Sequence, residues 1–83
     1  MKKTVYVTSE VVVSIDREKF DEEFMKEFRD SFYPFHTIDQ HIEHLAQLYA
    51  RGLCDNHSFI EGYGPAADMG IRFDLNHIES EIA

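Results

Sequence analysis

The amino-acid sequence predicts an α+β domain in which two helices pack on one face of an antiparallel sheet of two to three strands. Two observations lead to this prediction. Near both ends of the chain, apolar and polar residues alternate with a period of two, as in half-buried strands. Between these segments, apolar residues recur every three or four positions, which indicates amphipathic helices. We expect the order strand-helix-helix-strand-strand in a single domain covering residues 1–83.

The opening segment is expected to form a long strand. Its odd-numbered positions are apolar except for Ser9, and they are Val5, Val7, Val11, Val13 and Ile15. We expect these side chains to face the core, because a strand presents alternate residues to the same side. The opposite side should remain at least partly in water, as in an antiparallel sheet that is covered on one face.

The first helix is expected to run from Asp16 to about Tyr33. Phenylalanines recur at every fourth position and would share one flank of a helix, at Phe20, Phe24, Phe28 and Phe32. Asp16 has a side chain suited to an N-cap. Pro34 should end the helix, because the residue before a proline avoids the helical region.

The second helix is expected to begin at Thr37, whose spacing to Gln40 matches a capping box, and to end before Gly52. Its apolar stripe consists of Ile38, Ile42, Leu45 and Tyr49. Gly52 suits the left-handed position after a last turn, with Leu48 and Leu53 placed for the accompanying contact.

The last third of the chain gives weaker signals. We expect a loop over residues 54–58, a short strand over residues 59–61 and a final strand over residues 70–76. The alternation slips at His77 and Ile78, so either the final strand bulges there or the tail leaves the sheet.

Charge is the most informative feature of the composition. The chain carries 16 acidic and eight basic residues, with a formal net charge of −8. This balance argues against direct binding of nucleic acid, which requires a basic surface. The acidic residues either serve ordinary solvation, which is the simpler explanation of the count alone, or imitate a phosphate backbone for a basic partner. The imbalance is greatest in residues 31–83, where Arg51 and Arg72 are the only basic residues.

Cysteine content and hydropathy bear on location. Cys54 is the only cysteine, so no internal disulfide can form. Residues 4–10 are too polar for the apolar stretch of a signal peptide, and no segment approaches the length of a membrane span. We therefore expect a protein of a reducing cytoplasm that does not contact membranes.

Three groups of residues are candidates for chemistry. His41 and His44 could reach one metal ion, but no further ligands follow at a diagnostic spacing, so exposed or stripe-edge histidines are expected instead. Cys54 and His57 are too close in sequence for a typical nucleophile and base, and burial of the thiol is expected. The glycines around Tyr63 lack the lysine of a phosphate-binding loop; they serve backbone geometry or expose Tyr63 for contact. The prediction is a protein without enzymatic activity, cofactor or metal.

Over most of its length the chain resembles the small uncharacterised proteins of phages and prophages, among which anti-CRISPR and other inhibitors of host machinery are found. The resemblance lies in a valine-rich opening strand, two acidic helices, and the segments Glu61-Gly62-Tyr63-Gly64 and Gly70-Ile71-Arg72-Phe73 near the end. It implies a non-enzymatic inhibitor that binds by surface contact, often at a nucleic-acid-binding site of its target.

The sequence thus predicts an anti-CRISPR-like inhibitor that binds a basic, nucleic-acid-binding surface of a bacterial defence complex. The residues expected to contact this partner are the helical carboxylates Glu22, Glu23, Glu27, Asp30, Asp39 and Glu43. The alternative is a small structural or adaptor module that acts through homodimerisation or protein-protein contact. It would use an exposed strand edge or the open sheet face, which is lined by Tyr6, Thr8, Val12 and Arg72.

Overall fold

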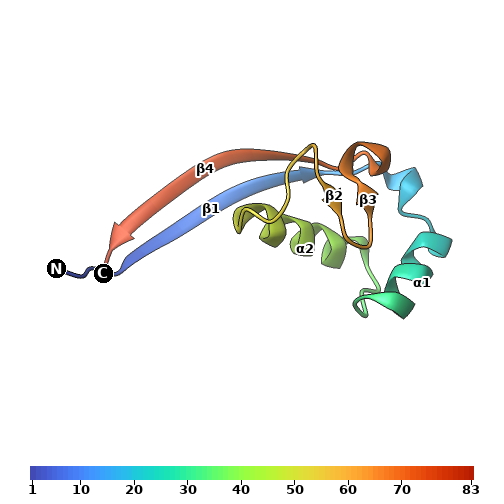
Figure 1. The fold of residues 1–83 in the computed structure, drawn as a ribbon, viewed down its shortest axis with the longest axis horizontal. Coiled ribbons are helices and arrows are strands. Elements are labelled where there is room, and N and C mark those ends of the chain that lie inside the picture. The colour runs from blue at the N-terminus through green and yellow to red at the C-terminus, as the bar shows by residue number, and fades with distance from the viewer.

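The computed structural model describes all 83 residues and consists of a small head from which a long two-stranded arm projects (Figure 1). The molecule measures 51 × 23 × 19 Å along its principal axes. The elements are β1 (Val5–Ser14), η1 (Arg17–Lys19), α1 (Glu22–Ser31), α2 (Ile38–Ala50), β2 (Phe59–Ile60), β3 (Gly64–Pro65), η2 (Ala66–Met69) and β4 (Arg72–Ile82). The predicted α+β class is confirmed. The four strands form two separate two-stranded sheets, β1 with β4 and β2 with β3.

The sheet of β1 and β4 joins the two ends of the chain. The strands are antiparallel, and Val5 pairs with Ile82 at the tip of the arm. The register shifts once, because Glu10 pairs with His77 while Val11 pairs with Leu75, which leaves Asn76 as an extra residue in β4. The Asn76 side chain donates a hydrogen bond to Glu10 Oε1 at 2.8 Å. The slip in the alternation is therefore a β-bulge, and β4 continues for six residues beyond it.

The outer part of the arm projects past the head, so no other element of the chain covers it (Figure 1). Of the odd-numbered valines of β1, only Val11 and Val13 pack against the core of the head. Val5 and Val7 remain 48% and 63% exposed, so the prediction that they face the core is wrong. Alternation identifies which residues share a face of a strand, but it does not show how far the rest of the protein extends along that face.

The first helix begins later than predicted. Asp16 caps the short helix η1, where its side chain accepts a hydrogen bond from the Glu18 amide. Asp21 is the N-cap of α1 and accepts from the Phe24 amide at 2.8 Å. Both aspartates satisfy the same local rule, because each supplies an oxygen to an unpaired amide of a first turn. Phe20 therefore precedes α1, and the helix ends at Ser31, two residues before Tyr33.

The second helix begins and ends as predicted. Thr37 and Gln40 form a reciprocal capping box, in which Gln40 Oε1 also accepts from the His36 amide. After the last turn Gly52 adopts a φ of 73°, and the Leu53 amide donates to the Leu48 carbonyl at 2.9 Å. This is the bond pattern of a Schellman motif.

The core lies in the head, where α2 packs beneath the part of the sheet nearest the bulge (Figure 1). The Tyr49 ring of α2 stacks on Phe73 of β4, with ring centroids 4.8 Å apart. The buried apolar side chains are Phe20, Met25, Phe28, Leu45, Cys54, Ile60, Tyr63, Ala66, Ile71 and Phe73. The expected loop over residues 54–58 and the strand at Phe59 are present, but β2 pairs with β3 and does not join the long sheet. Neither α-helix has the length and apolar composition required to cross a membrane.

The turn between β2 and β3 gives a test of the packing of the head. Gly62 and Gly64 both have positive φ, at 90° and 86°. A Cβ on Gly62 would come within 2.6 Å of Phe28 Cε2, whereas a Cβ on Gly64 would meet nothing within 4 Å. Both alanine variants should lose about 1 kcal/mol from backbone strain, and Gly62→Ala should lose about 1–3 kcal/mol more from overpacking.

Chemical denaturation of the two variants measures this difference directly. Equal free energies of unfolding for Gly62→Ala and Gly64→Ala would show that the hairpin does not pack on α1 as the structure has it.

Candidate functional site

A histidine occupies the centre of the head. His41 of α2 is fully buried, and its Nδ1 is 2.8 Å from the hydroxyl of Tyr63, which is also buried. The aromatic rings of five residues surround its ring, with centroids 4.7–6.0 Å away, and they belong to Phe20, Phe24, Phe28, Phe35 and Tyr63. Nε2 has no hydrogen-bond partner. Burial, with a smaller contribution from the nearby His44, lowers the pKa of His41 from 6.5 to about 4.

This arrangement corrects the expectation for His41 and decides between the two interpretations of the glycines around Tyr63, which serve backbone geometry. His41 lies in the core and not at an exposed or stripe-edge position, and Tyr63 is buried instead of being presented for contact. The sequence did contain a signal for His41. It lies three residues after Ile38 and four before Leu45, which places it on the apolar stripe of α2. Burial among aromatic rings favours the neutral form of His41, with its hydrogen bond to Tyr63.

The other two candidates for chemistry are His44, which lies near His41, and the thiol of Cys54. His44 packs against Tyr33 and Phe35, with ring centroids 5.0 and 5.3 Å away. Cys54 is buried, as predicted, and burial together with the nearby Asp55 raises the pKa of its thiol. A raised pKa lowers the fraction of reactive thiolate. No three His, Cys, Asp or Glu side chains of the chain come together as metal ligands would.

The six carboxylates predicted to contact a partner are all exposed, but they do not form one patch. Glu23, Glu27 and Asp30 share the outer flank of α1, because their spacing of four and three residues places them on one side of a helix. Glu22 and Asp39 instead line a cavity between η1, α1 and the start of α2. Glu43 lies one helical turn after Asp39 on α2 but does not line that cavity; it lies beside Phe35, His44 and Gln47.

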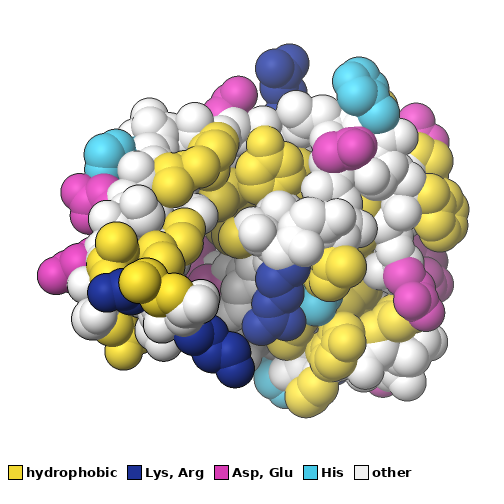
Figure 2. All heavy atoms as spheres, turned by 60° about the vertical axis from the view of Figure 1, so that its left-hand side comes forward, with side chains coloured by type: hydrophobic (Ala, Val, Ile, Leu, Met, Phe, Trp, Pro, Cys, Tyr) yellow, Lys and Arg dark blue, Asp and Glu magenta, His cyan; other side chains and the backbone are white.

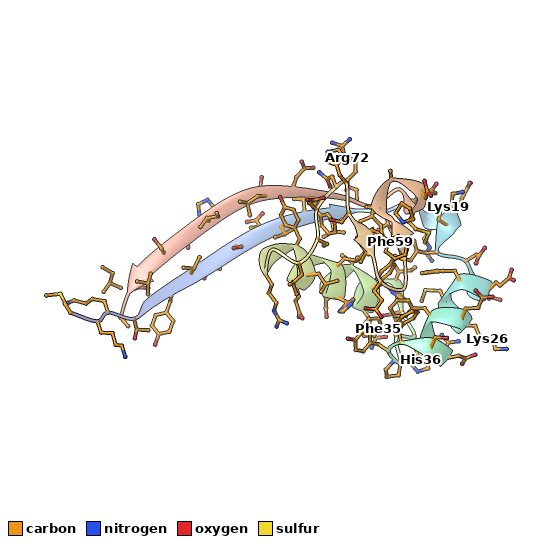
Figure 3. The ribbon with its side chains drawn as sticks, viewed as in Figure 1. Lys19, Lys26, Phe35, His36, Phe59 and Arg72 are labelled. Atoms are coloured by element: carbon orange, nitrogen blue, oxygen red, sulfur yellow. The ribbon has the colours of Figure 1, made fainter.

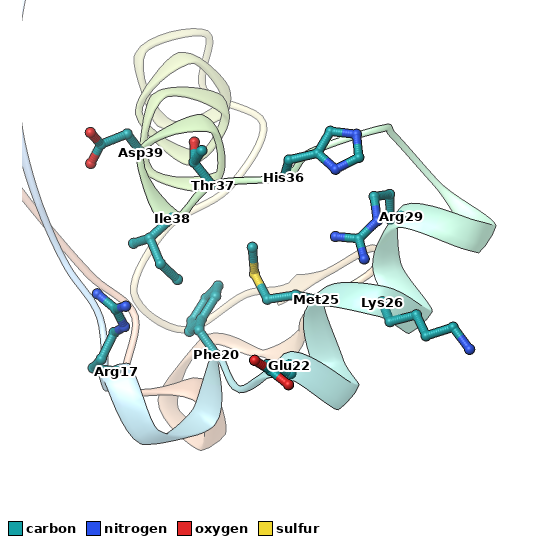
Figure 4. Close-up of a pocket in the computed structure, with 10 residues that line it drawn as sticks. All are labelled: Arg17, Phe20, Glu22, Met25, Lys26, Arg29, His36, Thr37, Ile38 and Asp39. Atoms are coloured by element: carbon teal, nitrogen blue, oxygen red, sulfur yellow. The ribbon is translucent and has the colours of Figure 1, made fainter.

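That cavity, of about 680 Å³, contains an unexpected group of basic residues. Arg17, Lys26 and Arg29 line it together with His36, and Figure 4 shows Lys26 pointing outward and the Arg29 guanidinium pointing inward. At the start of α2 the Gln40 amide donates to Thr37 Oγ1 and the Thr37 amide donates to Gln40 Oε1, so these two amides already have partners. Because Glu22 and Asp39 share the cavity, its charge is nearly balanced, and an anion gains little there.

A second cavity, of about 490 Å³, lies in an exposed apolar area of the head. Its exposed apolar lining side chains are Phe32, Tyr33, Leu53 and Phe59, with Phe59 75% exposed. We call these four residues the aromatic groove. Tyr33 is exposed, whereas Phe35 beside it is half-buried at the junction of the two helices (Figure 3). An exposed group of aromatic side chains is typical of protein-contact surfaces.

The acidic surface is almost entirely unneutralised. Every carboxylate of the 16 is exposed except Asp16, which is half-buried. No Lys or Arg lies in an ion pair with any of them, since the one charged contact within 4.0 Å joins His77 to Glu79. The face of the molecule on which the arm comes forward shows acidic side chains at its margins and several exposed groups of hydrophobic ones between them (Figure 2).

Comparisons of the chain with protein-family models, with curated proteins and with solved structures found no match.

The buried histidine predicts a pH dependence of stability. The native pKa of His41 is about 4 and the unfolded value 6.5, so between these values the unfolded chain binds a proton that the native state does not. Stability should therefore fall as the pH falls through this window, by about 2 kcal/mol between pH 7 and pH 5. Burial also lowers the pKa of His44, which acts in the same direction.

Urea denaturation of the native chain and of His41→Gln at pH 7 and pH 5 measures this effect. The variant should lose most of the difference between the two pH values. Titration of the His41 ring by NMR in the unaltered chain is an independent check, and a pKa near 6.5 would show that this ring is not buried.

Proposed function

We propose that the chain is a non-enzymatic inhibitor of the anti-CRISPR-like class, which binds a basic, nucleic-acid-binding surface of a bacterial defence complex. The observation that carries the proposal is the unneutralised acidic surface, in which all carboxylates except Asp16 are exposed and none pairs with Lys or Arg. Such a surface attracts basic partners and is available to form new ion pairs, because no internal pair must first be broken.

The outer flank of α1 is the best-formed part of this surface. Glu23, Glu27 and Asp30 lie on successive turns, and successive turns of a helix are about 5.4 Å apart along its axis. One strand of DNA carries a negative charge about every 3.4 Å of axis, so the spacing of the two rows of charge is of the same order. Arginine and lysine side chains that hold phosphates are long enough to contact carboxylates spaced in this way.

The remaining predicted carboxylates have a secondary role. Glu22 and Asp39 line the cavity that also contains Arg17, Lys26 and Arg29, so the basic residues partly offset their attraction for a partner. Glu43 lies on α2, beside the half-buried Phe35. The aromatic groove could add apolar contact, which exposed carboxylates alone do not provide.

Charge reversal on α1 tests the assignment. The tagged chain should retain a nucleic-acid-binding complex from a bacterial lysate at low salt and release it at high salt, because exposed ion pairs are screened. The triple variant Glu23→Lys, Glu27→Lys, Asp30→Lys should lose this binding. Each single substitution should cost about 1 kcal/mol or less.

A matched triple variant controls for net charge. Glu18→Lys, Asp68→Lys and Asp74→Lys also replace three exposed carboxylates, and both triple variants change the net charge from −8 to −2. The control should retain the captured complex. Equal losses in the two variants would mean that only net charge matters, and unchanged binding by the α1 variant would refute the assigned site.

A further inference from the structure

The outer half of the arm is a two-stranded ribbon that no other part of the chain covers. Residues 1–10 and 74–83 are all exposed. An isolated two-stranded ribbon is only marginally stable in water, and additional strands or a packed layer normally stabilise it. We therefore expect a further strand or a packed layer to stabilise this arm.

One face of the arm is mostly apolar, interrupted only by Ser9 and Ser80. The pairing places Val5 opposite Ile82 and Ser9 opposite Ile78, and these residues share the face of Val11 and Val13. The bulge at Asn76 is what keeps Ile78 and Ile82 on this face, because one extra residue reverses the alternation of β4. Four apolar side chains stay 48–64% exposed on the outer half of this face, and they are Val5, Val7, Ile78 and Ile82.

Three hydrogen bonds show which backbone groups point outward from the arm. The Ala83 amide donates to the Thr4 carbonyl, so Thr4 and Ala83 form a hydrogen-bonded pair at the tip. Near the head, the amide and carbonyl of Phe73 bond to the Asn56 side chain at 2.6 and 3.2 Å, so they point away from β1. Hydrogen-bonded and non-hydrogen-bonded pairs alternate along an antiparallel ladder. Thr4 belongs to a hydrogen-bonded pair and Val13, opposite Phe73, to a non-hydrogen-bonded one, so the even-numbered residues of β1 bond to β4. The odd-numbered residues of β1 therefore direct their amides and carbonyls to its outer edge.

The two edges of the arm differ. The outer edge of β4 is capped near the head by Asn56. The outer edge of β1 has no hydrogen-bond partner anywhere from Val5 to Ser14. This segment also contains no proline and no lysine, which are the residues that usually protect an exposed edge from pairing.

Charge favours the β1 edge for contact between two copies. Residues 1–15 carry Lys2, Lys3 and Glu10, a net charge of +1, whereas the rest of the chain carries −9. In β4 the acidic residues are Asp74, Glu79 and Glu81, so two β4 edges would bring like charges together. The β1 edge is where two copies of this acidic chain can approach with the least repulsion.

We propose that two copies of the chain associate through the outer edges of β1, so that the two arms form one four-stranded antiparallel sheet. With Ser9 opposite Ser9 of the second copy, Val7 lies opposite Val11 and Val5 opposite Val13 of that copy. The same register places Lys2 opposite Asp16 of the second copy. Helix α2 contacts β1, so an added strand at this edge lies beside α2 of the other head. The inference is independent of the acidic partner surface.

Two matched proline variants test the edge. Ser9 on β1 and Ser80 on β4 lie on the same face, and both direct their amides outward, so proline removes no bond of the β1–β4 ladder at either position. In sedimentation equilibrium over a range of concentrations the native chain should dimerise. Ser9→Pro should raise the dissociation constant by about tenfold or more, and Ser80→Pro should leave it unchanged. Dimerisation should persist at high salt, unlike binding through the carboxylates.

Two matched cysteine variants test the register and remain informative if a proline variant does not fold. In a Cys54→Ala background, Ser9→Cys should form a covalent dimer on oxidation, because paired Cα atoms about 5.5 Å apart suit a disulfide. Ser80→Cys should not. A native chain that stays monomeric at every concentration would overturn the inference. So would a dimer that Ser80→Pro dissociates and Ser9→Pro does not, or a cross-link formed by Ser80→Cys and not by Ser9→Cys.

Discussion

The pairing of β1 with β4 is the contact on which the rest of the structure depends. It brings the two ends of the chain together and sets the register in which Val13 lies beside Phe73 at the edge of the core. Phe73 in turn stacks on Tyr49, which fixes α2 against the sheet. A single extra residue, Asn76, keeps the apolar side chains of both strands on one face over the full length of the arm. Without the bulge, Ile78 and Ile82 would lie on the opposite face, and Glu79 and Glu81 would take their places beside the valines.

The features that the sequence predicted well depend on neighbours along the chain. The capping box of Thr37 and Gln40 and the left-handed Gly52 follow from local hydrogen bonding, and both are present. The start of α1 was misplaced because Asp16 and Asp21 satisfy the same local rule, and only packing decides which of them begins the long helix. The exposure of Val5 and Val7 could not be predicted, because alternation does not reveal where the head ends.

For the candidate sites too, the sequence predicted features that depend on neighbours along the chain and missed those that depend on tertiary packing. Residue type and helical spacing predicted the exposed carboxylates of α1, since charged side chains on a helix flank remain in water. The cavity between η1, α1 and α2 could not be predicted, because its basic residues Arg17, Arg29 and His36 come from three separate segments that meet only in the folded chain. The burial of His41 has a local signal, its position on the apolar stripe of α2, but its ring of aromatic neighbours is a tertiary feature.

The surfaces of the chain thus differ in chemistry, and each suits a different contact. The carboxylates of the helices carry an unpaired negative charge, which suits a basic partner. The edge of β1 is close to neutral and rich in valine, which suits a second copy of the chain. The most direct test of the central claim is competition at the captured complex. We predict that added nucleic acid displaces the chain from its partner. A ternary complex, in which the partner holds nucleic acid and the chain together with undiminished affinity, would contradict the account.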